Sequence, residues 1–358
     1  MDTLAKMATS FEPQGFGVDG WTPMERHGHL WHPWISGGGR RSRRLRCDRD
    51  PIRERERAEV KDMRCVAKWA LALTGVLMPT LLSAQDSFFD SNGVRVRYVE
   101  QGSGDPVVLV HGFSSNVETG WINTGVFSNL AKDYRVVALD LRGRGKSDKP
   151  TDAKAYGAEV ARDVVRLLDH LKIERAHMVG YSMGANIVAK LLTTDPDRFI
   201  TATLGGSAGR RNWTAEDDRA AEAEALEFEK GLPFRSAILR TWPTDQPKPS
   251  EDTIQRLSED RIKRGNDPAA FAADVRGRHA VAVTDAELAA IRVPTLAIVG
   301  SADTFLASVN AFKEVVPSVK VVVISGAAHG GASGAAGRPE FVEAIREFIA
   351  QNQHKPER

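Results

Sequence analysis

The pattern of hydrophobic and polar residues changes at about residue 85. From there on, short apolar runs recur along the chain, separated by segments with the 3.6-residue period of helices. Continuous apolar runs are typical of strands that are covered on both faces of a parallel sheet. Such strands are predicted by PVVLVHG (106–112), YRVVALDL (134–141), AHMVGYS (176–182), FITATLGG (199–206), VPTLAIVG (293–300) and KVVVISG (320–326).

Helices and one hairpin complete this pattern. Two further strands surround Asn92–Gly93, a dipeptide that favours a tight hairpin turn. Helices are predicted at 158–173, 183–194, around 305–316 and around 338–350. Strands that alternate with helices predict an α/β fold with a mostly parallel central sheet, an antiparallel N-terminal hairpin and helices on both faces.

One segment interrupts the alternation. Residues 207–290 contain no apolar strand-like run and are rich in Ala, Glu, Asp and Arg. We predict that they form a helical insertion, with residues 85–206 and 291–358 as the core domain. An insertion at the carboxyl edge of the sheet would act as a lid, because open α/β sheets bind ligands at that edge.

The first part of the chain does not resemble a folded domain. Residues 1–62 contain Gly-rich and Arg-rich patches without a sustained helix or strand period. The Arg run could bind RNA or a membrane, and His27, His29 and His32 could bind a metal. We favour a disordered leader, or upstream sequence translated from a start codon that precedes the true initiator, Met63.

The segment MRCVAKWALALTGVLMPTLLSAQ (63–85) has the features of a secretory signal peptide. It has a basic start, an apolar run of 14 residues and small residues at Ser83 and Ala84. The run is short for a stable membrane span, which needs roughly 20 residues. We predict a signal peptide at 63–84 and a periplasmic or secreted protein; the alternative is a membrane anchor at 66–84.

Charge and cysteine content narrow the function further. The formal net charge is only +2, which gives no general reason to expect a nucleic-acid partner. Both cysteines, Cys47 and Cys65, precede the predicted mature domain. That domain therefore has neither a disulfide nor thiol chemistry.

The main candidate for chemistry is the motif Gly180-Tyr181-Ser182-Met183-Gly184. This G-x-S-x-G lies where an apolar strand meets a helix, and a sharp turn there would lift the serine out of the backbone. Gly180 and Gly184 are required because a side chain would clash in so tight a turn. The alternative is a plain glycine-rich connection between strand and helix.

A serine hydroxyl needs a base to become a nucleophile. His329 is the best candidate, because it follows an apolar strand in a loop of small residues. The base needs a carboxylate to hold its tautomer, and Asp303 follows the preceding apolar strand. Asp303 could instead cap the helix that follows it. Asp140 is the rival acid, but it precedes the serine and lies in a tight turn that could use the carboxylate structurally.

The order Ser182, Asp303, His329 is the order expected for α/β-hydrolases. Residues 86–350 resemble this superfamily in several motifs. VLVHGF resembles its oxyanion loop, DLRGRGKSD the turn after the next strand and GYSMGA its nucleophile elbow, while GSAD and AAHGG match the acid and histidine loops. The superfamily's epoxide hydrolases and haloalkane dehalogenases use Asp as nucleophile, so the serine argues against those branches.

The resemblance implies an oxyanion hole made by the backbone N–H groups of Phe113 and Met183. The residue after the serine opens a helix, so its N–H points at developing negative charge. Ser182 would attack a carbonyl, His329 would transfer the proton, and water would release the acid. This route needs neither a metal nor an organic cofactor.

We therefore expect an exported serine hydrolase that cleaves a small-molecule carboxylic ester with an apolar acyl group. Trp213, Phe234, Trp242 and Phe271 could line the acyl pocket, or they could pack as a small core of the insertion. The same constellation would also serve a cofactor-free perhydrolase, a haloperoxidase-like enzyme or a C–C bond hydrolase. A non-catalytic binding protein is a further alternative, since the fold alone does not determine function.

Overall fold

The computed structural model describes residues 85–231 and 233–352. The predicted leader (1–62) and signal peptide (63–84) lie outside these residues. In the described part of the chain, none of the helices combines the length and the apolar character that crossing a membrane requires.

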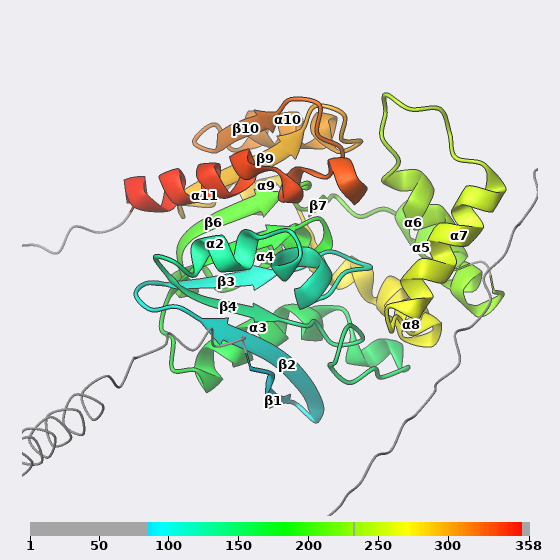
Figure 1. Ribbon diagram of the computed structural model, residues 1–358, viewed down its shortest axis with the longest axis horizontal. Coiled ribbons are helices and arrows are strands. Elements are labelled where there is room, and N and C mark those ends of the chain that lie inside the picture. The colour runs from blue at the N-terminus through cyan, green and yellow to red at the C-terminus, as the bar shows by residue number, and fades with distance from the viewer. Residues whose placement is uncertain (1–84, 232, 353–358) are drawn as a thin grey trace, which may run out of the picture. The chain divides into compact units, whose positions relative to one another are not determined.

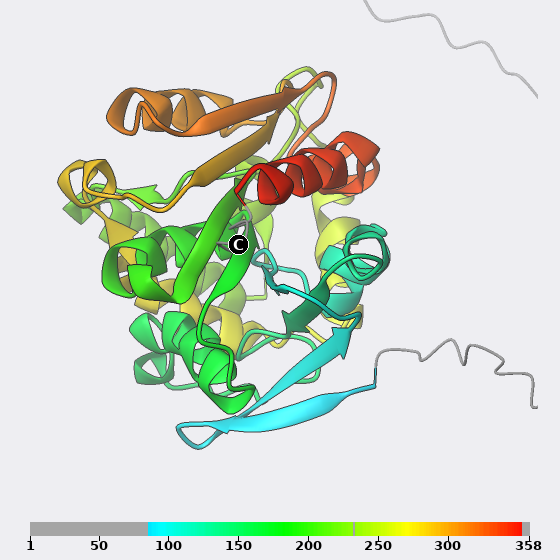
Figure 2. The same ribbon diagram turned by 90° about the vertical axis from the view of Figure 1, so that its left-hand side faces the viewer.

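Eight strands form one central sheet. Their bounds are β1 (Ser87–Ser91), β2 (Val94–Gln101), β3 (Pro106–Val110), β4 (Arg135–Leu139), β5 (Ala176–Tyr181), β6 (Phe199–Gly205), β9 (Thr295–Gly300) and β10 (Lys320–Ile324). They are ordered β1-β2-β4-β3-β5-β6-β9-β10, with the hairpin at one edge and β10 at the other (Figure 2). Strand β2 is antiparallel to both neighbours and all other pairs are parallel, which confirms the predicted sheet.

Helices connect the strands and form the insertion. Their bounds are α2 (Val126–Leu130), α3 (Ala158–His170), α4 (Met183–Thr194), α5 (Ala215–Glu229), α6 (Arg235–Arg240), α7 (Glu251–Lys263), α8 (Pro268–Gly277), α9 (Asp285–Ala289), α10 (Leu306–Val315) and α11 (Pro339–Asn352). Short helical turns lie at Glu118–Ile122, Ala153–Ala155, Pro196–Arg198, Arg278–Val281, Gly331–Ser333 and Ala335–Gly337.

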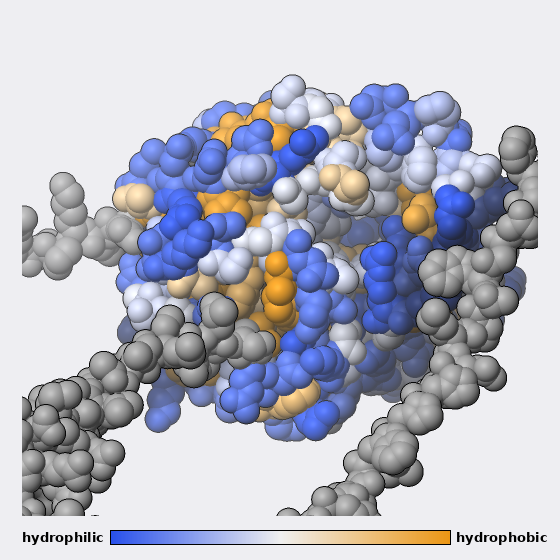
Figure 3. Space-filling view, in the orientation of Figure 1, coloured by the Kyte–Doolittle hydropathy of each residue, from blue (hydrophilic) through white to orange (hydrophobic). Residues whose placement is uncertain are grey.

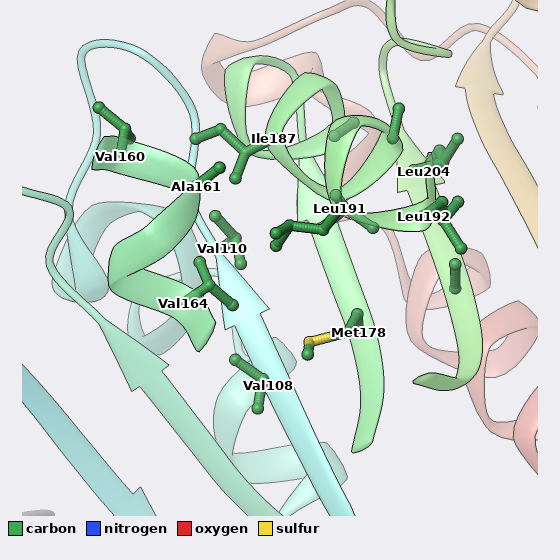
Figure 4. Close-up of a cluster of buried hydrophobic side chains, with 14 of the residues drawn as sticks. Val108, Val110, Val160, Ala161, Val164, Met178, Ile187, Leu191, Leu192 and Leu204 are labelled. Carbon is green, nitrogen blue, oxygen red and sulfur yellow. The ribbon is translucent and has the colours of Figure 1, made fainter. Parts of the chain in front are cut away.

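Two apolar clusters cover the two faces of the sheet. The first packs α3, α4 and α10 on one face, and the second packs α2 and α11 on the other. Strand β3 contributes to both, because Val108 and Val110 join the first cluster while Val107 and Leu109 join the second. Figure 4 shows side chains of α3 and α4 converging on Val108, Val110 and the neighbouring strands. Burial on both faces explains why the strand sequences are continuously apolar.

The hairpin at the sheet edge has the predicted tight turn. Asn92 and Gly93 both adopt positive φ, 58° and 80°, as a two-residue type I′ turn requires. The ladder pairs Ser91 with Val94 directly across the turn. Asparagine and glycine are the residues that tolerate this conformation best, so the sequence signal identified the hairpin correctly.

The residues between β6 and β9 form the insertion, which contains α5 to α9. Two short strands, β7 (Arg210–Arg211) and β8 (Ala282–Val283), pair with each other in it. A third apolar cluster fills its interior, where the ring centroids of Phe228, Phe234 and Phe271 lie 4.8 to 5.4 Å apart. In Figure 1, α5 to α8 stand beyond the arrowheads of the parallel strands, and Figure 3 shows mainly hydrophilic residues over that region.

One buried polar residue in the sheet limits the stability of the core at low pH. His177 of β5 is 1% exposed, and its Nδ1 lies 2.9 Å from the hydroxyl of Thr201. Burial lowers the pKa of His177 to about 4, against the weaker opposing effect of Asp105. The folded protein therefore holds a neutral imidazole there, whereas the unfolded chain binds a proton near pH 6.5.

Replacing His177 by glutamine should make the fold less sensitive to acid. The pKa of His177 is lower in the folded state than in the unfolded chain. The contribution of the neutral imidazole to the free energy of unfolding is therefore fully present above the unfolded pKa. It is lost as pH falls towards the folded pKa. The free energy of unfolding should fall by about 2 kcal/mol more in the wild type than in His177→Gln between about pH 7 and pH 5. Urea unfolding at several pH values measures this, and parallel pH curves would contradict it.

Candidate active site

Ser182 stands at the turn between β5 and α4. Its φ of 55° and ψ of −112° lie outside the ordinary regions for a side chain-bearing residue. The two motif glycines make the turn possible. A Cβ on Gly180 would lie 2.3 Å from the carbonyl oxygen of Gly184, and a Cβ on Gly184 would lie 2.0 Å from that of Val110. The G-x-S-x-G pattern thus has a steric cause, as the sequence predicted.

The structure brings Ser182, His329 and Asp303 together. The Nε2 atom of His329 lies 2.8 Å from Oγ of Ser182, and its Nδ1 atom lies 2.9 and 3.1 Å from the Asp303 carboxylate oxygens. The three residues follow β5, β9 and β10, so they meet at the carboxyl edge of the parallel sheet. His329 is 6% exposed and Asp303 is 2% exposed, which shields their hydrogen bond from water.

The two candidate acids have separate surroundings. Asp303 contacts His329, and its Oδ1 also accepts a 2.8 Å hydrogen bond from the N–H of Phe305, just before α10. Asp303 is not the cap of α10, whose N-cap is Phe305 without a side-chain hydrogen bond. Asp140 instead accepts hydrogen bonds from the N–H of Val117 and from Arg97, at 2.8 and 2.9 Å. It supports the loops after β3 and β4.

Two aromatic residues position His329. The Tyr181 hydroxyl donates to the carbonyl oxygen of His329 over 2.6 Å, and the Phe305 ring centroid lies 4.9 Å from the imidazole centroid. Gly206 leaves room for this packing, because its Cβ would lie 3.0 Å from Tyr181 and 3.1 Å from His329. No sequence motif indicated these roles, because Tyr181 occupies an unspecified position of G-x-S-x-G and Phe305 lies outside the motifs.

The predicted oxyanion-hole residues flank Ser182. The loop after β3 lies directly against the serine, since a Cβ on Gly112 would be in van der Waals contact, at 3.4 Å, with Cβ of Ser182. Within the described residues, neither the N–H of Phe113 nor that of Met183 has a hydrogen-bond acceptor. Both donors are therefore available to a ligand. The buried Arg144 donates a 2.7 Å hydrogen bond to the carbonyl oxygen of Phe113 and so orients this loop.

His111 has a structural position beside the site. Its Nε2 accepts a 3.1 Å hydrogen bond from the N–H of Leu141, so Nδ1 carries the proton and donates to the Gly112 carbonyl oxygen over 2.8 Å. Complete burial lowers the pKa of His111 to about 4. A neutral imidazole therefore ties the loop after β3 to the end of β4.

A cavity of about 480 Å³ adjoins Ser182 and His329, a volume typical of small-molecule sites. Its core side includes Phe113 and Met183, and its insertion side includes Ala237 and Leu257. The insertion side also carries several arginines: Arg210, Arg240, Arg261, Arg264 and Arg278. No sequence motif identifies these arginines, because they lie on or next to β7, α6, α7 and the turn after α8. Among the described residues, no group of three His, Cys, Asp or Glu side chains could hold a metal ion.

The four aromatic residues predicted to line an acyl pocket lie elsewhere. None of them, all in the described part of the chain, lines this cavity. Phe234 and Phe271 are completely buried in the insertion's own core, and Trp213 and Trp242 pack against that core. The prediction of substrate contact was wrong because scattered aromatic residues close the interior of a small helical layer first.

Two aromatic rings instead make cation–π contacts with arginines that line the cavity. The guanidinium carbon of Arg210 lies 5.3 Å from the ring centroid of Trp213, and that of Arg261 lies 5.4 Å from the centroid of Phe234. Such cation–π contacts hold a guanidinium over a ring face. The aromatic residues therefore affect the cavity indirectly, through the arginines.

A solved structure of similar architecture is that of Est816, described as an N-acyl homoserine lactone degrading enzyme. It is 28% identical, has a TM-score of 0.57, and the match covers 74% of this chain and all of Est816. Its fold agrees with the sheet and helices described above.

Relatives are also found by sequence. The chain is 35% identical to 3-oxoadipate enol-lactonase 1 of Acinetobacter baylyi over 175 residues, or 49% of this chain and 63% of the relative. It is 40% identical to a 2-hydroxymuconate semialdehyde hydrolase of a Pseudomonas species over 119 residues, or 33% of this chain and 41% of the relative. The chain thus matches less than two thirds of the length of either relative.

The family model described as the alpha/beta hydrolase fold matches residues 105–332, which include Ser182, Asp303 and His329. This match covers more than half of the chain and agrees with the sheet order and the turn after β5. The chain belongs to the alpha/beta hydrolase family.

Proposed function

We propose that this protein is a serine hydrolase that cleaves a carboxylic ester, open-chain or cyclic. The observation that carries the proposal is the hydrogen-bonded series Ser182–His329–Asp303, with 2.8 and 2.9 Å contacts at the mouth of a cavity. The similarity to an enol-lactonase, a protein named for hydrolysis of a cyclic ester, also supports it.

The first half-reaction forms an acyl-enzyme. The Ser182 oxygen attacks the carbonyl carbon while Nε2 of His329 takes the hydroxyl proton, and the Asp303 carboxylate stabilises the imidazolium. The N–H groups of Phe113 and Met183 donate to the oxyanion. As the tetrahedral intermediate collapses, His329 gives the proton to the leaving alcohol oxygen.

The second half-reaction regenerates the enzyme. A water molecule attacks the acyl carbon while His329 takes its proton, and the same two N–H groups hold the oxyanion. Collapse of this intermediate returns the proton to Oγ of Ser182 and releases the carboxylic acid. The alternating roles of His329 require that Nδ1 stays protonated, which the contact with Asp303 favours.

The insertion (207–290) would act as the lid of this site. Residues of α6 and α7 line the cavity together with the core loops, so the insertion restricts the access of solvent and of bulky substrates. Its apolar core packs on the loop after β3, where the ring centroid of Phe113 lies 4.7 Å from that of Phe271. We therefore assign substrate selection to the insertion and bond cleavage to the core.

A C–C bond hydrolase is the second candidate. The similarity to the 2-hydroxymuconate semialdehyde hydrolase favours it, because that relative shares 40% of the residues over the matched segment. Both reactions begin at a carbonyl group, so the same triad could serve either. Direct assay of ester and ring-cleavage substrates distinguishes the two.

Export is a separate proposal, supported by the signal-like sequence 63–84. Production of the full chain in a bacterial host should yield a periplasmic protein that begins near Gln85. N-terminal sequencing of the periplasmic fraction measures this. A mature chain that retains residues 1–62 would contradict it.

Ser182→Ala should abolish ester hydrolysis, because the nucleophile is removed while the fold keeps its turn. A series of p-nitrophenyl esters of increasing chain length measures kcat/KM for the wild type and the variant. The wild type should hydrolyse at least one of them. Equal rates for the two proteins, or no turnover of any ester, would contradict the proposal.

Asp303→Asn should slow the reaction about 10³- to 10⁴-fold, because an amide favours the wrong imidazole tautomer. The asparagine oxygen can still accept from the N–H of Phe305, which leaves its amino group facing Nδ1 of His329. Nε2 then carries the proton and cannot take one from Ser182.

The rate of covalent labelling by a fluorophosphonate measures this loss, since Ser182 attacks phosphorus and fluoride leaves without a proton from His329. Asp285→Asn is the matched control, because Asp285 pairs with Arg211 at the surface and lies outside the cavity. It should label at the wild-type rate. Equal labelling of Asp303→Asn would exclude Asp303 as the acid of the triad.

A further inference from the structure

The cavity above Ser182 carries an excess of positive charge. Among the described residues that line it are five arginines, and no Asp or Glu. Arg240 and Arg278 share a single carboxylate, that of Glu224, with contacts of 3.0 and 2.5 Å. One carboxylate cannot neutralise two guanidinium groups, so the cavity wall keeps a net positive charge.

Two partly buried arginines of this cavity, Arg210 and Arg261, form no ion pair with a described residue. The side chains of Arg210 and Arg261 make neither a hydrogen bond nor an ion pair with any described residue, and Nε of Arg210 and Nη1 of Arg261 are buried without an acceptor. Burial, together with the positive charges of Arg278 and Arg240, lowers the pKa of Arg210 to about 9, against the weaker opposing effect of Glu224 and Asp217. Burial and the neighbouring Arg264 and Arg240 likewise lower the pKa of Arg261 to about 10.

Unpartnered guanidinium groups of this kind destabilise the protein on their own. A buried donor without an acceptor loses its hydration without compensation, and like charges nearby add repulsion. Buried polar groups in folded proteins nearly always have a partner. A group that enters the cavity, carries negative charge and accepts hydrogen bonds would supply the missing partner.

We propose that the substrate is an anionic ester whose free carboxylate is bound by Arg210 and Arg261 while its ester carbonyl lies at Ser182. This proposal rests on the proposed ester hydrolysis. A carboxylate fits the planar fork of a guanidinium with two parallel hydrogen bonds. This anionic substrate differs from the ester with an apolar acyl group that the sequence predicted.

The positive wall adjoins the reacting atoms. The guanidinium carbon of Arg278 lies 4.4 Å from the ring centroid of Phe113, whose N–H belongs to the proposed oxyanion hole. The arginines and Ser182 line the same cavity of about 480 Å³. The proposed substrate, a small dicarboxylic half-ester, would lie in this one cavity with its ester at the serine and its free carboxylate at the arginines.

A pair of matched esters tests the proposal. Mono-p-nitrophenyl glutarate carries the free carboxylate, and its methyl diester has the same chain with the charge removed. The wild type should show a kcat/KM at least about tenfold higher for the half-ester, the effect expected of charge-assisted hydrogen bonds. The double variant Arg210→Gln/Arg261→Gln should lose about tenfold of this ratio, and each single variant should lose part of it.

The control is Arg235→Gln. Arg235 lies on α6 of the same insertion, pairs with Glu251 at 2.7 Å and does not line the cavity. It should keep the wild-type ratio of half-ester to diester. A ratio near one in the wild type, or a ratio that the cavity variants leave unchanged, would overturn the proposal.

A binding measurement separates this proposal from ester hydrolysis itself. Calorimetric titration of Ser182→Ala with glutarate should detect binding, and addition of the two cavity substitutions should abolish it. Binding of glutarate without turnover of either ester would refute the ester hydrolase and support the anion site. Turnover of the diester without glutarate binding would refute the anion site alone, and tighter binding of inorganic phosphate than of glutarate would overturn the choice of a carboxylate.

Discussion

The strained backbone at Ser182 is the constraint on which the site depends. Its φ of 55° persists because the surrounding sheet holds both ends of the turn. The N–H of Ser182 donates to the carbonyl oxygen of Gly205 over 2.7 Å, and Gly184 packs directly on the carbonyl of Val110. Three adjacent strands, β3, β5 and β6, therefore determine where the serine oxygen stands. A rigid sheet provides what a flexible loop could not.

Parallel topology then gathers the remaining groups. Every parallel strand ends at the same edge, so the loops after β3, β9 and β10 bring Phe113, Asp303 and His329 to the turn after β5. Polar residues with no part in the proposed chemistry hold these loops. The neutral His111 ties one loop to β4, and Asp140 accepts hydrogen bonds from the N–H of Val117 and from Arg97.

The insertion contributes by a different principle. It has its own aromatic core, and Arg144 of the core domain joins it through a 2.6 Å ion pair with Asp274 of α8. Its cavity face is rich in arginine, while Trp213 and Phe234 stack behind Arg210 and Arg261. The core domain thus presents the nucleophile and base, and the insertion presents charge to the rest of the substrate. The core domain therefore serves bond cleavage, and the insertion serves substrate binding.

The sequence by itself determined the fold class, the Asn92–Gly93 hairpin and the positions of Ser182, Asp303 and His329, because each depends on local chemistry. An apolar run between turn signals, a glycine where a side chain would clash, and a polar residue after a strand are readable one segment at a time. Only the tertiary structure decided which side chains face the cavity. The arginines that line it come from separate elements, and the aromatic residues predicted to bind substrate pack in the interior of the insertion. Which side chains line the cavity, and which have partners, depends on how the helices of the insertion pack.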